Sequence, residues 1–158
     1  MLKDLLTPQL SNHPCCVPQD ASLRDVAQIM KKEDIGCVLV TRGTTRIPIG
    51  IITDRDLVTR CLADSLSIDH ATAREIMTPN IRTVREDTGL FDCIRTMNEA
   101  GIRRIPVVNS SGEAVGVLSF GDILRLLSNE LGTLTENCTA SGLDRKRTEK
   151  SQKTVKIA

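Results

Sequence analysis

The sequence predicts an α+β fold made of two copies of one strand-helix-strand-strand-helix unit, packed sheet against sheet with pseudo-twofold symmetry. Three observations lead to this prediction: an internal repeat covers most of the chain, each copy carries one amphipathic helical stripe, and each copy ends in the same short motif. A unit of about sixty residues with so few strands has a marginal core by itself. Two such units are therefore expected to cover each other's exposed faces.

The repeat can be followed residue by residue. Residues 3–8 match 74–79 in charge and apolar character, and residues 20–40 match 87–107 with no gap. An internal repeat determines the architecture as a whole, so it is identified before the single helices and strands. We expect the following organisation: a first repeat at 2–66, a connection at 67–72, a second repeat at 73–131 and a polar, basic, disordered tail at 132–158.

Spacing and composition predict the elements within each copy. Apolar residues recur at i, i+3, i+4 and i+7, which is typical of an amphipathic helix, at Leu23, Val26, Ala27 and Met30 and again at Leu90, Cys93, Ile94 and Met97. Short β-branched runs next to glycine-containing turns predict strands. The expected strands are Cys15–Val17, Cys37–Val40 and Ile49–Ile52, then Ile81–Val84, Ile105–Val108 and Val115–Leu118, and the expected closing helices are Asp54–Ala63 and Gly121–Leu127.

Composition excludes several classes of protein. Phe91 and Phe120 are the only aromatic residues, and the net charge is +4 in residues 144–158 but −3 in the rest, so a nucleic-acid surface with stacking aromatics is not expected. The six cysteines follow no Cys-x-x-Cys spacing, and no apolar run reaches membrane-spanning length. We expect a cytoplasmic protein with reduced thiols and no membrane contact.

The motif that closes each copy is the main functional feature. Gly50–Asp56 and Gly116–Asp122 both run from a glycine through two apolar residues to a hydroxyl residue, with an aspartate three positions later. A strand that turns into a helix at this point offers free amides to a phosphate, and the aspartate can accept ribose hydroxyls. The same pattern also forms a simple capping box. Both roles can coexist.

At this point the residues resemble a known family. A tandem repeat whose copies begin near Leu-Thr-Pro or Met-Thr-Pro and end in Gly-apolar-apolar-Ser/Thr-x-x-Asp is similar to a cystathionine-β-synthase (CBS) domain pair, or Bateman module. The resemblance covers residues 2 to about 131 and looks like a free-standing pair. It implies two clefts that bind adenosine compounds such as AMP, ADP, ATP, NAD or S-adenosylmethionine.

The resemblance also implies site residues. Thr53 and Ser119 stand where the family holds phosphate or ribose, and Asp56 and Asp122 stand where it grips ribose hydroxyls. Walls are implied for the Asp56 cleft at Ile102 and Arg103, and for the Asp122 cleft at Ile35 and Gly36. Arg104 stands where related sensors keep a phosphate-binding arginine. Arg55 is matched by Gly121 in the second copy, so we expect unequal clefts, with a ligand phosphate near Arg55 and Arg104.

These features predict a non-catalytic regulatory sensor that binds an adenine nucleotide and forms a homodimer. Its effector protein would act in trans. Neither a Ser/His/Asp set nor a P-loop can be assembled, and His13 with Cys15 and Cys16 lacks the spaced pairs of a zinc site. No catalytic cofactor or metal is therefore expected. The alternatives are a ligand-free dimerisation or scaffold module and, with less support, an enzyme that acts on a nucleotide.

Overall fold

The computed structural model describes residues 14–135 and divides the chain into two compact units between Ser119 and Phe120. The first unit holds two sheets and the helices that cover them, and the second begins with a helix at 120–135. His13 and most of the predicted tail, from residue 136 onward, lie outside the described residues.

The first sheet has the strand order β1-β2-β3-β4, with β1 parallel to β2 and the other neighbours antiparallel. Its elements in chain order are β1 (Cys16–Pro18), α2 (Leu23–Lys32), β2 (Cys37–Thr41), β3 (Pro48–Thr53), α3 (Asp54–Asp56), the π-helix η1 (Leu57–Leu62), α4 (Ala73–Ile76) and β4 (Thr78–Pro79).

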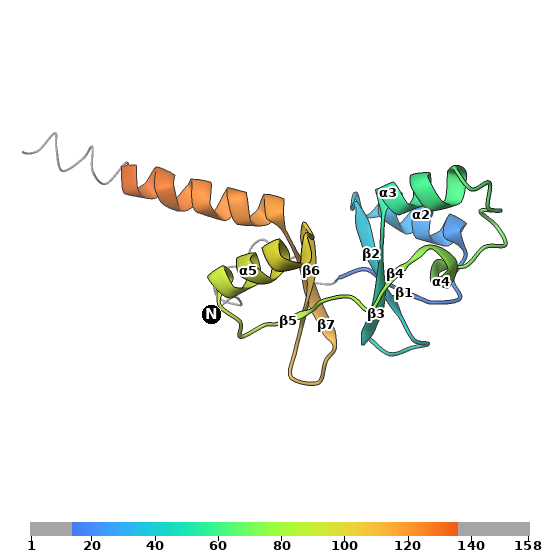
Figure 1. Cartoon of the computed structure of the whole chain (residues 1–158), viewed down its shortest axis with the longest axis horizontal. Helices are drawn as coiled ribbons and strands as arrows, with labels where there is room; N and C mark the ends of the chain where they lie inside the picture. The colour runs from blue at the N-terminus through green and yellow to red at the C-terminus, as the bar shows by residue number, and fades with distance from the viewer. Residues whose placement is uncertain (1–13, 136–158) are drawn as a thin grey trace, which may run out of the picture. The chain divides into compact units, whose positions relative to one another are not determined.

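The second sheet repeats this arrangement with the order β5-β6-β7, again parallel and then antiparallel. Its elements are β5 (Val84–Arg85), α5 (Leu90–Ala100), β6 (Arg104–Val108) and β7 (Ala114–Ser119). The register shifts at equivalent points of the two sheets, between Val40 and Thr41 and between Val107 and Val108. Figure 1 shows α2 and α4 beside the first sheet and α5 beside the second, as an α+β repeat predicts.

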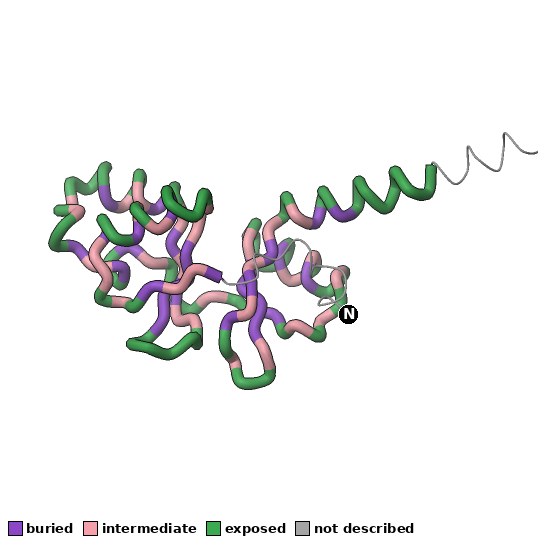
Figure 2. Tube along the Cα trace, turned by 180° about the vertical axis from the view of Figure 1, so that it is seen from behind, coloured by how far each residue is buried: buried purple, intermediate pink, exposed green. Residues whose placement is uncertain are grey.

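The amphipathic stripes form the helices that the spacing predicts. In α2 the side chains of Leu23, Val26 and Met30 are buried, and the Ser22 hydroxyl caps the helix by accepting from the Asp25 amide at 3.1 Å. In α5 Cys93 and Met97 are buried, and the helix ends at Gly101 with a left-handed φ of 62°. Figure 2 shows buried residues along the strands and on one side of these helices.

Four features differ from the sequence prediction. The strand expected over Ile81–Val84 is the two-residue β5, Val84–Arg85. The segment expected as one helix over Asp54–Ala63 is a short α-helix followed by a π-helix. The helix expected to end at Leu127 continues to residue 135, so the first residues of the predicted tail, 132–135, are helical. The sequence prediction contained neither α4 nor β4, because elements of four and two residues carry no periodicity.

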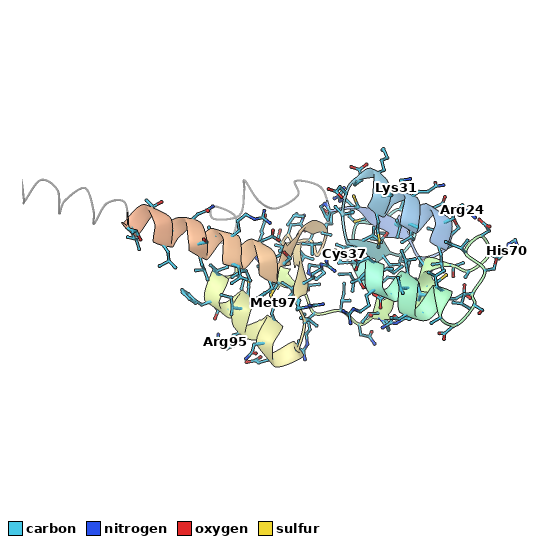
Figure 3. The ribbon with its side chains drawn as sticks, turned by 90° about the horizontal axis from the view of Figure 1, so that it is seen from above. Arg24, Lys31, Cys37, His70, Arg95 and Met97 are labelled. Atoms are coloured by element: carbon cyan, nitrogen blue, oxygen red, sulfur yellow. The ribbon has the colours of Figure 1, made fainter. Side chains whose placement is uncertain are left out.

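The connection at 67–72 packs against the start of α2. The amides of Leu23 and Arg24 donate to the carbonyl oxygens of Ala71 (3.1 Å) and Ile68 (3.0 Å), so these carbonyls satisfy amides that have no partner inside the helix. The Arg24 guanidinium also pairs with the Asp69 carboxylate and holds the pKa of that carboxyl below its usual value. Figure 3 shows Arg24 and His70 together at this end of the first repeat.

Both sequence copies contribute to the first sheet and its core. Thr78 pairs with Ile51 and Pro79 pairs with Gly50, which makes β4 the fourth strand of the first sheet. Ala73 and Ile76, from α4, are fully buried in the same core as Leu23 and Ile52. The first residues of the second sequence copy thus belong to the first sheet and its core.

Candidate nucleotide pocket

A pocket of about 940 Å³ lies where β3 ends, and it is bordered by residues from both sequence copies. This volume is at the upper end of the range of about 300–1,000 Å³ that is typical of small-molecule sites. The residues that line it are Ile51, Thr53, Asp54, Arg55, Asp56, Val58, Thr59, Thr78, Gly101, Ile102, Arg103 and Arg104.

The junction between β3 and α3 is held by a reciprocal capping box. The Asp56 carboxylate oxygen Oδ2 accepts from the Thr53 amide at 2.8 Å and from the Thr53 hydroxyl at 2.7 Å, and the Asp56 amide donates back to that hydroxyl at 3.3 Å. The Asp54 amide donates to the carbonyl oxygen of Gly36 at 3.2 Å. The capping role that the motif allows is therefore present at Asp56, together with its place in the pocket wall.

Asp56 is a buried carboxylate whose charge is balanced from outside the pocket. Its side chain is 12% exposed, and its Oδ1 lies 3.3 Å from Nε of Arg60, four residues later on η1. Nη1 of Arg60 donates to the carbonyl oxygen of Ile76 at 2.8 Å. Arg60 does not line the pocket. Replacement of Asp56 by alanine would therefore remove a cap and an ion pair as well as a pocket carboxylate.

Three other arginines line the pocket: Arg55 from the first copy, and Arg103 and Arg104 from the second. None of their guanidinium groups forms an ion pair with a carboxylate of residues 14–135. Asp56 is neutralised by Arg60, which leaves three guanidinium groups and the carboxylate of Asp54, so the pocket wall has an excess of positive charge. A guanidinium group is a planar fork of donors that suits phosphate oxygens.

Arg104 also contacts the first repeat at Gly36. A Cβ atom built on Gly36 would lie 2.9 Å from Nη2 of Arg104 and 3.4 Å from Oδ2 of Asp54. The absence of a side chain at Gly36 leaves room for this guanidinium. The atoms nearest to a Cβ built on Gly36 belong to Arg104 and Asp54, which line the Asp56 pocket, and the assignment of Gly36 to the Asp122 cleft stays a prediction. Ile35 packs against the core of the first repeat.

The second predicted site falls across the division between the two units. Ser119 is the last residue of β7, and Gly121 and Asp122 lie in the first turn of the helix at 120–135. Within that helix Asp122 Oδ1 lies 3.8 Å from Nη2 of Arg125. The structure brings the other predicted residues, Thr53, Arg55, Asp56, Ile102, Arg103 and Arg104, to one pocket.

Sequence reasoning missed several residues of this region. Arg60 could have been found from its i+4 spacing to Asp56, which is favourable for an acidic residue followed by a basic one on a helix. Val58 and Thr59 lie on η1 within three residues of Asp56, and Ile51 is one of the two apolar positions of the motif itself. Thr78 gives no local signal, because it reaches the pocket only through the pairing of β4 with β3.

The described residues contain no cluster of three or more His, Cys, Asp or Glu side chains that could hold a metal ion. Burial raises the pKa of the Cys93 thiol to about 11, so this thiol remains protonated and packs as a small apolar group. Among residues 14–135, no helix combines the length and the apolar composition that a membrane crossing requires.

Comparison with known sequences gives consistent matches. The family model described as the CBS domain matches residues 2–63 and 73–129. Hypoxic response protein 1 of Mycobacterium tuberculosis is 34% identical over 112 residues, which cover 71% of this chain and 77% of that protein. The uncharacterized protein MK0525 of Methanopyrus kandleri is also 34% identical over 112 residues, which cover 71% of this chain and 57% of that relative. The chain thus spans little more than half of the length of MK0525.

Solved structures agree with these matches. The crystal structure of Hypoxic Response Protein I, which holds two coordinated zinc ions, has a TM-score of 0.67 and 30% identity, covering 78% of this chain and 96% of that one. The CBS domain pair of protein MJ0100 was solved in complex with 5′-methylthioadenosine and S-adenosyl-L-methionine. It has a TM-score of 0.70 and 28% identity, covering 82% of this chain and 97% of that one.

Proposed function

The chain belongs to the CBS-domain family and carries two such domains in tandem, and from that premise we propose that it is a regulatory module that binds an adenine nucleotide in the Asp56 pocket. CBS-domain pairs are in general regulatory modules without catalysis of their own. The observation that carries the proposal is one pocket that combines a buried aspartate with three arginines that have no carboxylate partner among residues 14–135.

The charges of the pocket favour a phosphorylated ligand. S-Adenosylmethionine, which the MJ0100 pair binds, carries a positively charged sulfonium group that the guanidinium groups of Arg55, Arg103 and Arg104 would repel. A nucleotide instead places negative charge beside them, and charge-assisted hydrogen bonds from guanidinium to phosphate are among the stronger polar interactions. AMP, ATP and NAD all meet this requirement.

The remaining wall suits the nucleoside. Ile51, Val58 and Ile102 offer aliphatic contacts to a base, and no aromatic residue lines this pocket. The adenine ring would therefore pack between aliphatic side chains, with backbone groups as its hydrogen-bond partners. Asp56 would accept a ribose hydroxyl.

A bound nucleotide would link the two repeats. Asp56 and Arg55 belong to the first repeat, and Ile102, Arg103 and Arg104 belong to the second. A ligand that contacts both stabilises the arrangement in which they lie at binding distance, and this differential affinity is what a regulatory module needs in order to shift between two states. An effector protein in trans, or a second copy of the chain, would bind preferentially to one of these two states.

The test is calorimetric titration of the full chain with AMP, ATP, NAD and S-adenosylmethionine, with thermal unfolding measured on the same samples. We expect the phosphorylated ligands to bind and to raise the unfolding temperature. A free ligand concentration of 100 times Kd adds about 2.7 kcal/mol to the stability of the folded state. S-Adenosylmethionine should bind more weakly. No heat and no thermal shift with any phosphorylated ligand at millimolar concentration would contradict the proposal.

A second candidate function is a ligand-free dimerisation or scaffold module. It is favoured by large apolar side chains that remain exposed in the first unit, with Val58 at 56%, Leu62 at 67% and Phe91 at 78%. Exposed apolar groups of this size often mark protein contacts. Light scattering on the titration samples separates the two candidates, because a dimer that binds none of the nucleotides is consistent only with the dimerisation or scaffold module.

A further inference from the structure

Arg60 links the pocket carboxylate of Asp56 to the backbone at the start of the second repeat. Its Nε lies 3.3 Å from Oδ1 of Asp56, and its Nη1 donates to the Ile76 carbonyl oxygen at 2.8 Å. Ile76 is the last residue of α4 and is fully buried. Its carbonyl belongs to a helix end and has no partner within the helix. Arg60 therefore satisfies two groups that would otherwise lack a partner.

The hydrogen bonds of Asp56 show which of its oxygens can still accept. A carboxylate oxygen has two lone-pair sites. Oδ2 uses both, because it accepts from the Thr53 amide and from the Thr53 hydroxyl. Oδ1 has Arg60 as its one described partner and retains a free site. A ribose hydroxyl that binds to Asp56 must therefore use the oxygen that Arg60 holds.

The local backbone places Arg60 behind the pocket wall. Asp56 ends α3, and the chain continues as the π-helix η1, a rare conformation that is frequent at functional sites. Val58 and Thr59, on the first part of η1, line the pocket, whereas Arg60 does not. Arg60 thus differs from Arg55, Arg103 and Arg104, which line the pocket directly.

We propose that Arg60 is a positioning residue for ribose recognition. It fixes Oδ1 of Asp56 through one nitrogen and is itself fixed by the Ile76 carbonyl through another, so the free acceptor site is held in one direction. This inference rests on the proposed nucleotide function and adds the residue that gives it selectivity for a ribose hydroxyl. Without Arg60, the carboxylate is held only by its cap at Thr53, so the whole group turns more freely about its Cβ–Cγ bond and hydroxyl recognition is lost.

The experiment compares AMP with 2′-deoxy-AMP and 3′-deoxy-AMP by calorimetry on the full chain. A hydrogen bond to a charged group corresponds to about tenfold or more in affinity, so the wild type should bind at least one deoxy analogue about tenfold more weakly than AMP. In Arg60→Met this ratio should fall to about one. In Asp56→Asn the ratio should already be reduced, and adding Arg60→Met to it should change the ratio no further.

Two control variants separate positioning from general damage. Arg55→Met removes a guanidinium that lines the pocket, so it should weaken all three ligands by a similar factor and preserve the ratio. Arg95→Met removes an exposed arginine on α5 that pairs with Asp92, and it should change neither affinity nor ratio. Figure 3 shows Arg95 on the outer side of α5, while Met97 lies on its inner side.

The outcomes are distinguishable. If Arg60→Met folds and keeps the wild-type ratio, the positioning role is wrong while the nucleotide site stands. If Arg60→Met does not fold, Arg60→Gln is measured in its place. Its side chain is too short to reach both Asp56 and the Ile76 carbonyl oxygen, so the anchor at Ile76 is lost and a retained ratio again contradicts the inference. If the wild type binds none of the three ligands, the proposed function fails and the inference fails with it.

Discussion

Gly36 provides the space that the Arg104 guanidinium occupies. Any Cβ at this position would approach Nη2 of Arg104 to 2.9 Å, which is closer than Cβ atoms come to their neighbours in real structures. Nη2 is the far end of a flexible side chain rather than a backbone atom, so an added Cβ would displace the Arg104 side chain and leave the backbone in place. Gly36 therefore influences which position the second-repeat arginine takes beside the first repeat.

We predict that Gly36→Ala leaves the stability of the fold nearly unchanged and weakens the binding of AMP severalfold, because it displaces Arg104 from the pocket wall. The measurement is calorimetry of Gly36→Ala, Arg104→Gln and the double variant. The double variant should bind as Arg104→Gln does, since residues that act through one contact are not additive. Gly132→Ala, at a glycine with no neighbour within 4 Å of the added Cβ, is the control. Additive losses would show that Gly36 does not act through Arg104.

Much of the Asp56 pocket could be predicted from local sequence. The pattern Thr53-x-x-Asp56 specifies a helix start at the end of a strand, and the structure has the reciprocal hydrogen bonds that this pattern predicts. Arg55, Arg103 and Arg104 followed from the family resemblance. The contact of Arg104 with Gly36 could not be predicted, because it joins residues that are far apart in the sequence and depends on how the two repeats pack.

At the scale of elements, α4 is a four-residue helix whose start depends on one acidic side chain. The Glu75 carboxylate oxygen Oε2 accepts from the Thr72 amide at 2.6 Å and from the Thr72 hydroxyl at 2.8 Å. These hydrogen bonds hold the pKa of Glu75 below its usual value, with the backbone amide as the larger cause. The carboxylate form is therefore preferred in the folded state.

This preference has a defined pH dependence. A carboxyl whose pKa is lower in the folded state stabilises the fold above its unfolded pKa of about 4.3, and this contribution is lost as the pH falls through the folded value. We predict that the wild type is more stable than Glu75→Gln at pH 7 and that the difference shrinks steadily below pH 5. Urea unfolding followed by circular dichroism at pH 7, 5, 4 and 3 measures it. A difference that stays constant over this range would contradict the role of the charge.

The elements that sequence predicts best are those with many residues in one pattern. The stripes of α2 and α5 were predicted from apolar spacing. Five of their residues are buried, and the other three, Ala27, Leu90 and Ile94, are half-buried. The π-helix η1 was not predicted, because Leu57–Leu62 shows the same residue types that an α-helix would. The end of the last helix was placed too early, since Ser128, Asn129 and Gly132 weaken the apolar pattern without ending the helix.

At the scale of the whole molecule, the two sequence copies do not coincide with the two sheets. The strand β4 and the helix α4 come from the second copy, yet β4 pairs with β3 and Ile76 fills the first core with 1% of its surface exposed. A cut at the apparent boundary before Ala73 would leave β3 as an open edge and remove buried side chains from the core.

We predict that a fragment of residues 1–80 unfolds at a higher urea concentration than a fragment of residues 1–72, because only the longer one contains β4 and the buried residues of α4. The matched control is a fragment of the same length in which residues 73–80 are replaced by a Gly/Ser sequence, and it should behave like the shorter fragment. Circular dichroism during urea titration gives the midpoints. Equal midpoints for the native and Gly/Ser fragments would show that β4 and α4 do not stabilise the first sheet.

The first sheet ends later in the sequence than the first repeat does. This difference limits the positions at which two related genes can recombine without separating strand partners. A duplication copies the stretch of gene that encodes one repeat, but the unit that must fold together ends several residues later, after Pro79. Exchange of one repeat between two relatives at the visible repeat boundary would join a sheet to a foreign fourth strand. Chimeras that cross over beyond Pro79 keep the native strand partners together, so functional hybrids are expected to have their junctions there.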